Sequence, residues 1–546
     1  MRILSASIKN FRSIQEMSLG PNPGLNMLVG ENSAGKSNIF LAIQKCLGAA
    51  ASGGWPFSKD DLRYGESREP LAIQCQIELD SEEQDKLLME LTEELTTRDL
   101  REQAQLRLNQ LGRTIEFTTE WDDPIKRSYA RLGPLFIQEN HASNQLRDGG
   151  SRDHWRLFLE RLLASRNNLS LALQQIQEPL LSPNLRVRAS RVIHEHFLGF
   201  EEFRTRPNSG GRHTSLDART GQETSGVLFN LKNHRDRYQR LRYEQIQREF
   251  STLLPALTFE AVEQQPGGQL DVQFLQSGSQ FVIPLANVSA GVAEILSWVT
   301  NLVARERHVL VLENPEQHLH PHHQRALHRL IMGAAQRNQV FIVTHSPFFV
   351  EPTHLHGLSR VWMTSEGTKI NPFASDMKER ELAALTESLR DVGKREMLFA
   401  RAVLLVEDET ARAFISTVAP RLGSEYNLDS HSVSVTSVEG EDGFSPYIKL
   451  LRNLNVPFLC LRDKRGGSPP EDQKHFRFLD GEFEEFMIRE GFKEELENSR
   501  KTVGSNHART GRHLGQNIVL ERVPKLFKDL LTEIKELAQQ QAATKS

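Results

Sequence analysis

The segment Leu25–Ile39 (LNMLVGENSAGKSNI) constrains the fold of this chain more than any other stretch. A short apolar run ends at Gly30, and the residues that follow match the pattern G-x-x-x-x-G-K-[ST] at every fixed position. The glycines at 30 and 35 allow the backbone to curl so that its N–H groups point at phosphate oxygens. Lys36 adds a positive charge, and the Ser37 hydroxyl is able to ligate Mg²⁺. An apolar strand before the loop and a helical pattern after it complete the context, so the chain is predicted to bind a nucleoside triphosphate.

Length, charge and cysteine content describe the setting of this core. The 546 residues suffice for about two to four domains. The net charge is only −4, so any contact with nucleic acid has to come from a local patch. Cys46, Cys75 and Cys460 lie far apart without metal-ligand spacing, which is typical of buried thiols in a reducing compartment. The N-terminus lacks the apolar core of a signal peptide and no apolar run could span a bilayer, so we expect a soluble, cytoplasmic protein with no membrane partner.

Strand and helix patterns alternate on either side of a long charged stretch. Alternation of apolar and polar residues predicts strands within Met1–Leu28 and Pro70–Asp80. Ser81–Gly112 instead has helical periodicity, with a start signal in Ser81. Strand patterns return at Thr114–Trp121 and Ala130–Gln138. This order predicts an α/β core that is split by an insertion.

Part of this insertion is rich in arginine, and two interpretations remain open. Acidic neighbours such as Glu201 and Asp236 balance part of the charge, as on a solvated helical face. A surface for nucleic acid is the other interpretation. The arginines in question are Arg186, Arg188, Arg191, Arg204, Arg206, Arg212, Arg235, Arg237, Arg240 and Arg242.

Three later segments have an order that suits a nucleotide site. Ser289 and Gly291 stand at the start of a predicted helix, where a second helix N-terminus could hold a phosphate. The apolar run HVLVL is suited to a fully buried strand and ends at Glu313, a carboxylate that is well placed to hold Mg²⁺ through water. The segment FIVTHSP places His345 just after the next strand, where it could sense a γ-phosphate.

Four clustered histidines offer a competing interpretation as a metal site. The segment HLHPHH falls where a turn and a helix start are expected, and no cysteine or carboxylate within it completes a metal geometry. A turn is therefore the favoured interpretation. The histidines are His318, His320, His322 and His323.

Taken together, this ordered set resembles the ABC-type ATPases, with Walker A at 30–37, a signature near 289–291, Walker B at 309–313 and a switch histidine at 345. Within that class, IKNFRSI and LENPEQHLHP resemble the RecF/SMC-related ATPases of the overcoming-lysogenization-defect (OLD) family. The resemblance implies that two heads sandwich ATP, each offering its phosphate loop to the other's signature. It also implies the roles of individual residues. These are nucleotide contacts for Gly30, Asn32, Gly35, Lys36, Ser37 and Asn38, a Q-loop role for Gln138, signature contacts for Ser289 and Gly291, Mg²⁺ binding for Ser37 and Glu313, and γ-phosphate sensing for His345.

One departure from this class concerns hydrolysis. The position after the Walker B acid, usually a glutamate that activates water, is Asn314. An amide cannot take a proton from water, so ATP turnover is expected to be slow. Glu316 is the remaining candidate for this role.

The C-terminal third opens a second strand series. The run Ala402–Val406 (AVLLV) is followed by Glu407, and Pro457–Leu461 leads to Asp463. Carboxylates at the carboxyl ends of neighbouring parallel strands are how metal sites are built in open α/β sheets. A plain solvated strand end is the alternative.

This order resembles a Toprim domain, and an ABC-type head followed by Toprim is the OLD architecture. The resemblance implies that Glu407, Asp463 and an acid in GEFEEFMI, either Glu484 or Glu485, bind Mg²⁺ for cleavage of phosphodiesters. The match is broken where Arg465 replaces a second aspartate, where Ala411 replaces an often acidic residue, and near Gly511, where no lysine occurs. A guanidinium at a cation site opposes Mg²⁺, which makes a one-metal or inactive domain easier to build than a two-metal nuclease.

The predicted fold class is therefore α/β, with an ABC-type ATPase head that a helical insertion interrupts and a smaller Toprim-like α/β domain behind it. The predicted domains are the N-terminal part of the head at 1–80, a mainly helical insertion at 81–255, the C-terminal part of the head at 256–375, the Toprim-like domain at 395–510, and a C-terminal helix at 511–546.

Three functions fit these features. The first is an ATP-binding, slowly hydrolysing sensor or scaffold of bacterial anti-phage defence, which passes the damaging step to a separate effector protein from the same operon. The second is an ATP-regulated, Mg²⁺-dependent DNA endonuclease, and the third is a RecF-like repair ATPase. Arg465 and Ala411 favour the first. Each implies ATP and Mg²⁺ as cofactors, a homodimer or higher even oligomer, and DNA or another nucleic acid as partner.

Overall fold

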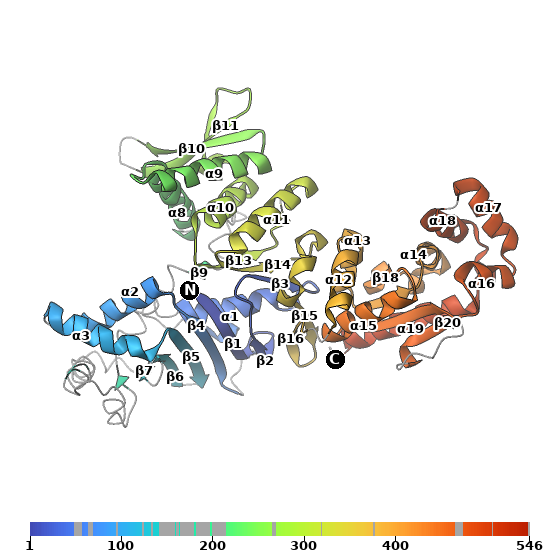
Figure 1. Ribbon diagram of the computed structural model, residues 1–546, viewed down its shortest axis with the longest axis horizontal. Helices are drawn as coiled ribbons and strands as arrows, with labels where there is room; N and C mark the ends of the chain where they lie inside the picture. Colours follow the sequence, from blue (N-terminus) through green and yellow to red (C-terminus); the bar gives the residue numbers. More distant parts are fainter. Residues whose placement is uncertain are drawn as a thin grey trace. The chain divides into compact units, whose positions relative to one another are not determined.

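A computed structural model of the chain divides into two compact units, Met1–Met27 with Gly35–Phe349, and Leu28–Ala34 with Val350–Ser546 (Figure 1). Among the described residues, no helix is both long and apolar enough to cross a membrane. The residues that the structure describes are 1–48, 57–63, 69–93, 95, 97–122, 125–132, 135–140, 159, 163, 180–181, 197–198, 215–264, 269–317, 319–374, 377–464, 473–504 and 506–543.

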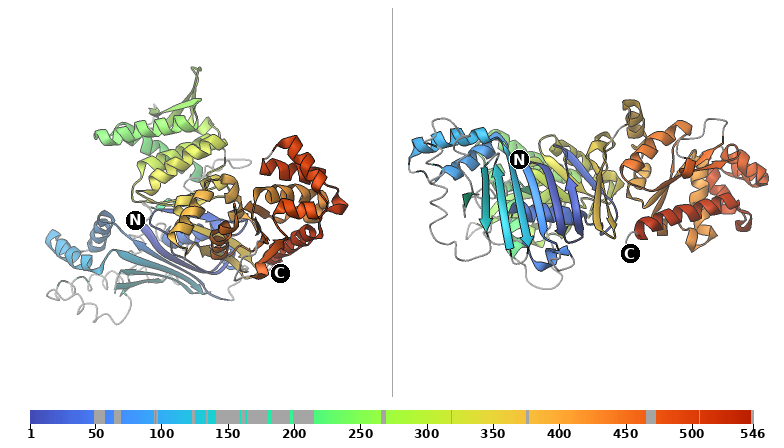
Figure 2. Two further views of the ribbon diagram at one scale, coloured as in Figure 1. Left: turned by 45° about the vertical axis from the view of Figure 1, so that its right-hand side comes forward. Right: turned by 90° about the horizontal axis from the view of Figure 1, so that it is seen from below.

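The first unit contains a seven-stranded sheet in the order β2-β1-β4-β5-β6-β7-β8, whose strands lie side by side in the right-hand view of Figure 2. Alternate residues of β4 are buried, among them Ile73, Cys75 and Ile77, which explains the period of two in the sequence. Strands β5, β6 and β7 fall inside the predicted insertion and extend the sheet of β1, β2 and β4. The bounds are β1 Arg2–Phe11, β2 Ile14–Leu19, β4 Leu71–Glu78, β5 Thr114–Asp122, β6 Ile125–Leu132, β7 Leu135–Asn140 and β8 Leu180–Leu181.

A second sheet of this unit carries the nucleotide motifs. Strand β13 pairs in parallel with β14 and with β9, and β3 lies beside β14. Every residue of β3 and β14 is buried, as the continuous apolar runs predict. Helix α1 packs on this sheet through Phe40, whose ring contacts that of Phe341. The bounds are β3 Leu25–Val29, β9 Phe197–Leu198, β13 Val309–Glu313, β14 Gln339–Val343, α1 Lys36–Gly48, α10 Ala290–Ala304 and α11 Pro321–Ala335.

The remaining elements of the first unit are two helical pairs and a small antiparallel sheet. The predicted helical stretch at 81–112 forms two helices, and Asp80 caps the first of them in a capping box with Glu83. Phe250 of α9 packs on Phe259 of β10 and Phe274 of β11, which joins the second pair to the sheet. The bounds are α2 Ser81–Thr92, α3 Arg98–Leu108, α8 Ser215–Lys232, α9 Arg237–Leu253, β10 Leu257–Gln264, β11 Gln269–Gln276 and β12 Val282–Pro284.

The second unit is built on a four-stranded parallel sheet in the order β18-β17-β19-β20. Phe414, Phe483 and Phe527 form an aromatic cluster in its core. An antiparallel pair, β15 and β16, precedes it in the chain. The bounds are β15 Leu358–Thr364, β16 Gly367–Pro372, α12 Glu379–Ser388, α13 Val392–Arg395, β17 Ala402–Val406, α14 Glu409–Leu422, β18 Val433–Ser437, α15 Phe444–Asn453, β19 Phe458–Asp463, β20 Phe476–Leu479, α16 Phe483–Arg489, α17 Lys493–Val503, α18 His507–Asn517 and α19 Lys525–Ala543.

Both units combine strands and helices, and the parallel sheet predicted for the C-terminal part is present. The predicted α/β class is therefore confirmed.

Helices α14 and α18 approach each other closely at Gly511. The Toprim family has a lysine near this position, which this chain lacks. A Cβ at Gly511 would collide with the carbonyl oxygen of Thr410. Replacing Gly511 by alanine is therefore expected to destabilise the protein by about 1–3 kcal/mol, although alanine favours a helix by about 1 kcal/mol. Thermal unfolding followed by circular dichroism measures the change. The matched control is Gly333→Ala in α11, where an added Cβ meets no atom within 4 Å; equal melting temperatures for the two variants would contradict the prediction.

Candidate nucleotide site and acidic strand ends

The predicted phosphate loop has the backbone shape that its glycines permit. Gly30, Ser33 and Gly35 have φ values of 143°, 61° and 95°, and α1 begins at Lys36. A Cβ at Gly30 would collide with the carbonyl oxygen of Val361, so the left-handed conformation and the close approach both require glycine there. Asn38 N–H donates to the carbonyl of Gly35 at 3.0 Å, which closes the first turn of the helix. The loop thus presents a helix N-terminus next to a buried Lys36, as a phosphate cradle requires.

The Walker B strand brings its acid to the same loop. Glu313 is the last residue of β13, and its carboxylate accepts a hydrogen bond from the hydroxyl of Ser37, the second residue of α1. Hydroxyl and carboxylate oxygens are ligands that Mg²⁺ prefers. The fold thus brings these two predicted magnesium ligands, which are 276 positions apart in the chain, into hydrogen-bond contact.

Asn314 has an unusual environment directly after Glu313. Its φ of 49° is left-handed, a conformation that asparagine tolerates better than most residues. Its N–H donates to the carbonyl of Val343 at 2.7 Å, which ties the end of β13 to the end of β14. Within the described residues its side-chain Oδ1 is buried and has no hydrogen-bond partner.

Glu316 holds the loop that follows β14. Its carboxylate accepts hydrogen bonds from the Thr344 hydroxyl at 2.7 Å and from His345 N–H at 2.9 Å. His345 itself is exposed. His345, the predicted γ-phosphate sensor, and Glu316, the candidate for activating water, are therefore joined by a hydrogen bond from the backbone N–H of His345 to the Glu316 carboxylate.

The signature residues lie at the start of α10. Ser289 is the N-cap, and its Oγ accepts from Val292 N–H at 3.4 Å, while Gly291 falls in the first turn. Ser289 is exposed, so this helix N-terminus faces solvent in the single chain.

The remaining candidates are Gln138, the clustered histidines and the arginines of the insertion. Gln138 lies within β7, in register with Tyr129 of β6, rather than after a strand. His320 caps α11 and stacks on His322, and His318 lies outside the described residues. Of the predicted arginines that are described, Arg240 donates to the carbonyls of His234 and Arg235, and Arg242 pairs with Glu306.

The acidic strand ends of the second unit meet as predicted. Glu407 follows β17 and Asp463 ends β19, and these strands are neighbouring and parallel. Both side chains are buried, and Asp463 N–H donates to Glu407 Oε2 at 3.0 Å. Asp408 caps α14 by accepting from Ala411 N–H at 2.8 Å, and burial raises the pKa of Asp408 above its ordinary value.

The third predicted metal ligand is engaged elsewhere. Glu484 of α16 forms an ion pair with Arg500 of α17, and the other candidate, Glu485, lies 3.9 Å from Arg489 of its own helix. In the part of the chain that the structure describes, no three His, Cys, Asp or Glu side chains form a metal-binding group. Arg465 lies outside the described residues.

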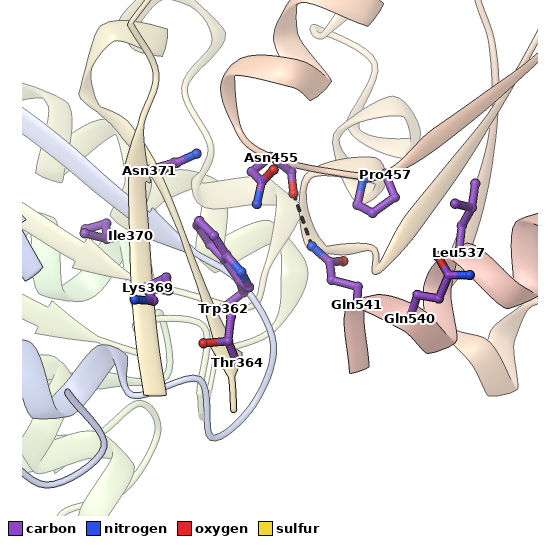
Figure 3. Close-up of a pocket in the computed structure, with 10 residues that line it drawn as sticks. All are labelled: Trp362, Thr364, Lys369, Ile370, Asn371, Asn455, Pro457, Leu537, Gln540 and Gln541. Carbon is purple, nitrogen blue, oxygen red and sulfur yellow. Dashed lines mark hydrogen bonds between the residues drawn. The ribbon is translucent and has the colours of Figure 1, made fainter. Parts of the chain in front are cut away.

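A pocket of about 480 Å³ lies in the second unit between the β15–β16 hairpin, the start of β19 and α19 (Figure 3). Trp362 is among the side chains that line it, and Gln541 Nε2 donates to the carbonyl of Asn455 at 3.1 Å. The same Gln541 accepts from Arg360, which is almost completely buried. Sequence analysis missed this arginine because no motif marks it.

Comparisons with known proteins agree with this arrangement. Residues 25–351 match the family described as "AAA domain, putative AbiEii toxin, Type IV TA system", and residues 398–464 match "Overcoming lysogenization defect protein-like, TOPRIM domain". The chain is 24% identical over 484 residues to an OLD nuclease of Thermus scotoductus, covering 84% of this chain and 81% of that protein.

Two further matches were found. An uncharacterised protein of Methanocaldococcus jannaschii is 25% identical over 237 residues, which is 43% of this chain but only 28% of that protein. A solved Smc head bound to the C-winged helix domain of ScpA covers 68% of this chain and 97% of its own, with 13% identity and a TM-score of 0.38.

Proposed function

Because the chain belongs to the OLD family, with an AAA/ABC-type ATPase domain followed by an OLD-like Toprim domain, we propose that it is an ATP-controlled sensor or scaffold of bacterial anti-phage defence. ATP binding closes a homodimer or higher even oligomer, which detects nucleic acid or an invader protein in the cytoplasm. A separate effector protein then performs the damaging step. The single observation that carries this proposal is the Ser37–Glu313 contact beside an asparagine at position 314.

This arrangement favours holding a nucleotide over hydrolysing it. Lys36 and the loop N–H groups would bind the phosphates, and Ser37 and Glu313 would hold Mg²⁺, which screens the phosphate charge when it is bound. Asn314 cannot accept a proton from water, and both carboxylate oxygens of Glu316 already accept hydrogen bonds from the loop after β14. Ser289 and Gly291 of a second chain would complete the site.

The predicted metal ligands of the second unit favour binding of nucleic acid over its cleavage. Glu407 accepts a hydrogen bond from the backbone of Asp463, and Glu484 is paired with Arg500. Among the described residues, only two of the predicted ligands, Glu407 and Asp463, meet at this edge, which favours binding over cleavage of nucleic acid by two metals.

A second candidate function is favoured by one observation. The similarity to the OLD nuclease of Thermus scotoductus runs through both domains of this chain. An ATP-regulated, Mg²⁺-dependent DNA endonuclease with its own Toprim active site is therefore the alternative.

Incubation of the purified protein with plasmid DNA in Mg²⁺ or Mn²⁺, with and without ATP, separates the two candidates. The scaffold function predicts intact plasmid, together with ATP binding and turnover well below 1 s⁻¹, the lower end of ordinary enzymes. Glu407→Ala and Asp463→Ala serve as controls against a contaminating nuclease. Cleavage by the wild type that disappears in both variants would replace the scaffold with the endonuclease.

A further inference from the structure

Glu31, the first residue after Gly30 in the phosphate loop, is bound to Arg401, the residue directly before β17 of the second unit. Its two carboxylate oxygens accept hydrogen bonds from Arg401 Nε and Nη2, each at 2.8 Å. Bidentate pairs between arginine and a carboxylate are among the stronger charge-assisted hydrogen bonds. Both residues belong to the same compact unit, because Leu28–Ala34 groups with Val350–Ser546.

Arg401 stands directly before the strand that leads to the acidic edge. Its N–H donates to the carbonyl of Ser432 at 2.8 Å, and the five residues of β17 that follow it are all buried. β17 is paired on both sides, with β18 and with β19, and ends next to Glu407. A shift of Arg401 would therefore be passed along a rigid strand to Glu407.

Two further contacts close a ring around this ion pair. Gly30 lies against the carbonyl of Val361, and the preceding residue, Arg360, donates to the carbonyl of Ala400 at 3.1 Å. Ala400 in turn precedes Arg401. Three pairs of consecutive residues therefore contact one another. They are Gly30–Glu31 in the loop, Arg360–Val361 in β15 and Ala400–Arg401 directly before β17.

The charges give the pair a second role. An isolated Glu31 carboxylate within the loop would repel an incoming triphosphate, and Arg401 neutralises that charge. The bidentate hydrogen bond to Glu31 raises the pKa of Arg401, which keeps the guanidinium charged. The positive partner is supplied by the sheet that carries the acidic edge, not by the loop itself.

We propose that Arg401 is a positioning residue that, through Glu31, couples nucleotide occupancy of the phosphate loop to the conformation of β17 and its acidic end. This inference rests on the nucleotide binding proposed above. Coupling of this kind is reciprocal, so whatever displaces β17 also changes the affinity for ATP.

Three variants test the coupling, namely Glu31→Gln, Arg401→Gln and Arg401→Lys. ATP affinity is measured by titration calorimetry, and hydrogen exchange of a peptide covering 402–408 is compared with and without ATP. In the wild type, ATP is expected to slow exchange in this peptide. Glu381→Gln, which breaks an ion pair with Lys449 in the same unit, is the matched control and should behave as wild type.

The signs of the effects distinguish positioning from a merely structural contact. Arg401→Gln removes the guanidinium charge next to Glu31 and should weaken ATP binding about tenfold, whereas Glu31→Gln removes the repelling charge and should bind ATP at least as well as wild type. Both should lose the protection of 402–408. Arg401→Lys keeps the charge without the planar fork, so it should retain affinity and lose most of the protection.

The outcomes separate this inference from the proposed function. Wild-type protein that binds no ATP would overturn both. ATP binding with unchanged protection in Glu31→Gln, or equal losses of affinity in Glu31→Gln and Arg401→Gln, would overturn the coupling alone.

Discussion

Lys36→Ala is expected to weaken ATP binding by about 100-fold or more, which corresponds to about 3 kcal/mol. Lys36 is the first residue of α1 and is buried at the end of the loop, and in the phosphate-loop pattern this lysine contacts the β- and γ-phosphates. Alanine leaves the phosphate charge without this partner and keeps the helix. Titration calorimetry with ATP and Mg²⁺ measures the loss, and the proposed defence function predicts that protection against phage in cells disappears with it.

The control for Lys36→Ala is the same substitution at a lysine outside the phosphate loop. Lys86 lies on α2 of the same unit, with an exposed side chain near Glu82, and Lys86→Ala should bind ATP like wild type. Full phage protection by Lys36→Ala would contradict a requirement for nucleotide binding.

Arg360→Ala is expected to cost about 3–5 kcal/mol of stability in the second unit. The guanidinium donates to the carbonyl of Asn455 at 2.7 Å, to that of Ala400 at 3.1 Å and to Gln541 Oε1 at 3.2 Å. Burial lowers the pKa of Arg360 to about 10, with Glu31 opposing the shift, so the side chain is charged at neutral pH. Its removal takes these hydrogen bonds away from the three acceptors and leaves a cavity beside Trp362, over whose ring the guanidinium lies.

Urea unfolding followed by tryptophan fluorescence measures this change. Arg390→Ala removes an exposed ion pair with Glu387 and is expected to stay within about 0.5 kcal/mol of wild type. A midpoint for Arg360→Ala that matches that of Arg390→Ala would show that the buried hydrogen bonds contribute nothing.

Local sequence pattern was enough to predict the fold class and the secondary structure around the proposed nucleotide site. The glycine spacing, the buried strand before Glu313 and the helix start at Ser289 are each encoded within a few residues, because backbone conformation and burial period are local properties. The apolar runs at Ala402–Val406 and Pro457–Leu461 predicted the parallel strands of the second sheet for the same reason.

What could not be predicted depends on contacts between distant segments. Glu31 and Arg401 are 370 positions apart, and position 31 is unspecified in the phosphate-loop pattern. The alternation of apolar and polar residues in Thr114–Trp121 predicts a strand but not its partner, because a strand with this pattern could pair with any exposed strand edge. In the structure it pairs with Leu71–Glu78. The engagement of Glu316 with Thr344 and His345 likewise follows from the fold, not from spacing.

The assignment of Leu28–Ala34 to the C-terminal unit has a consequence for dissecting the protein. A fragment that stops at Phe349 would include every residue of the Walker A motif and still lack Val361 and Arg401, on which the first half of the loop rests. A truncation between the ATPase domain and its neighbour would therefore remove contacts that support the predicted phosphate loop.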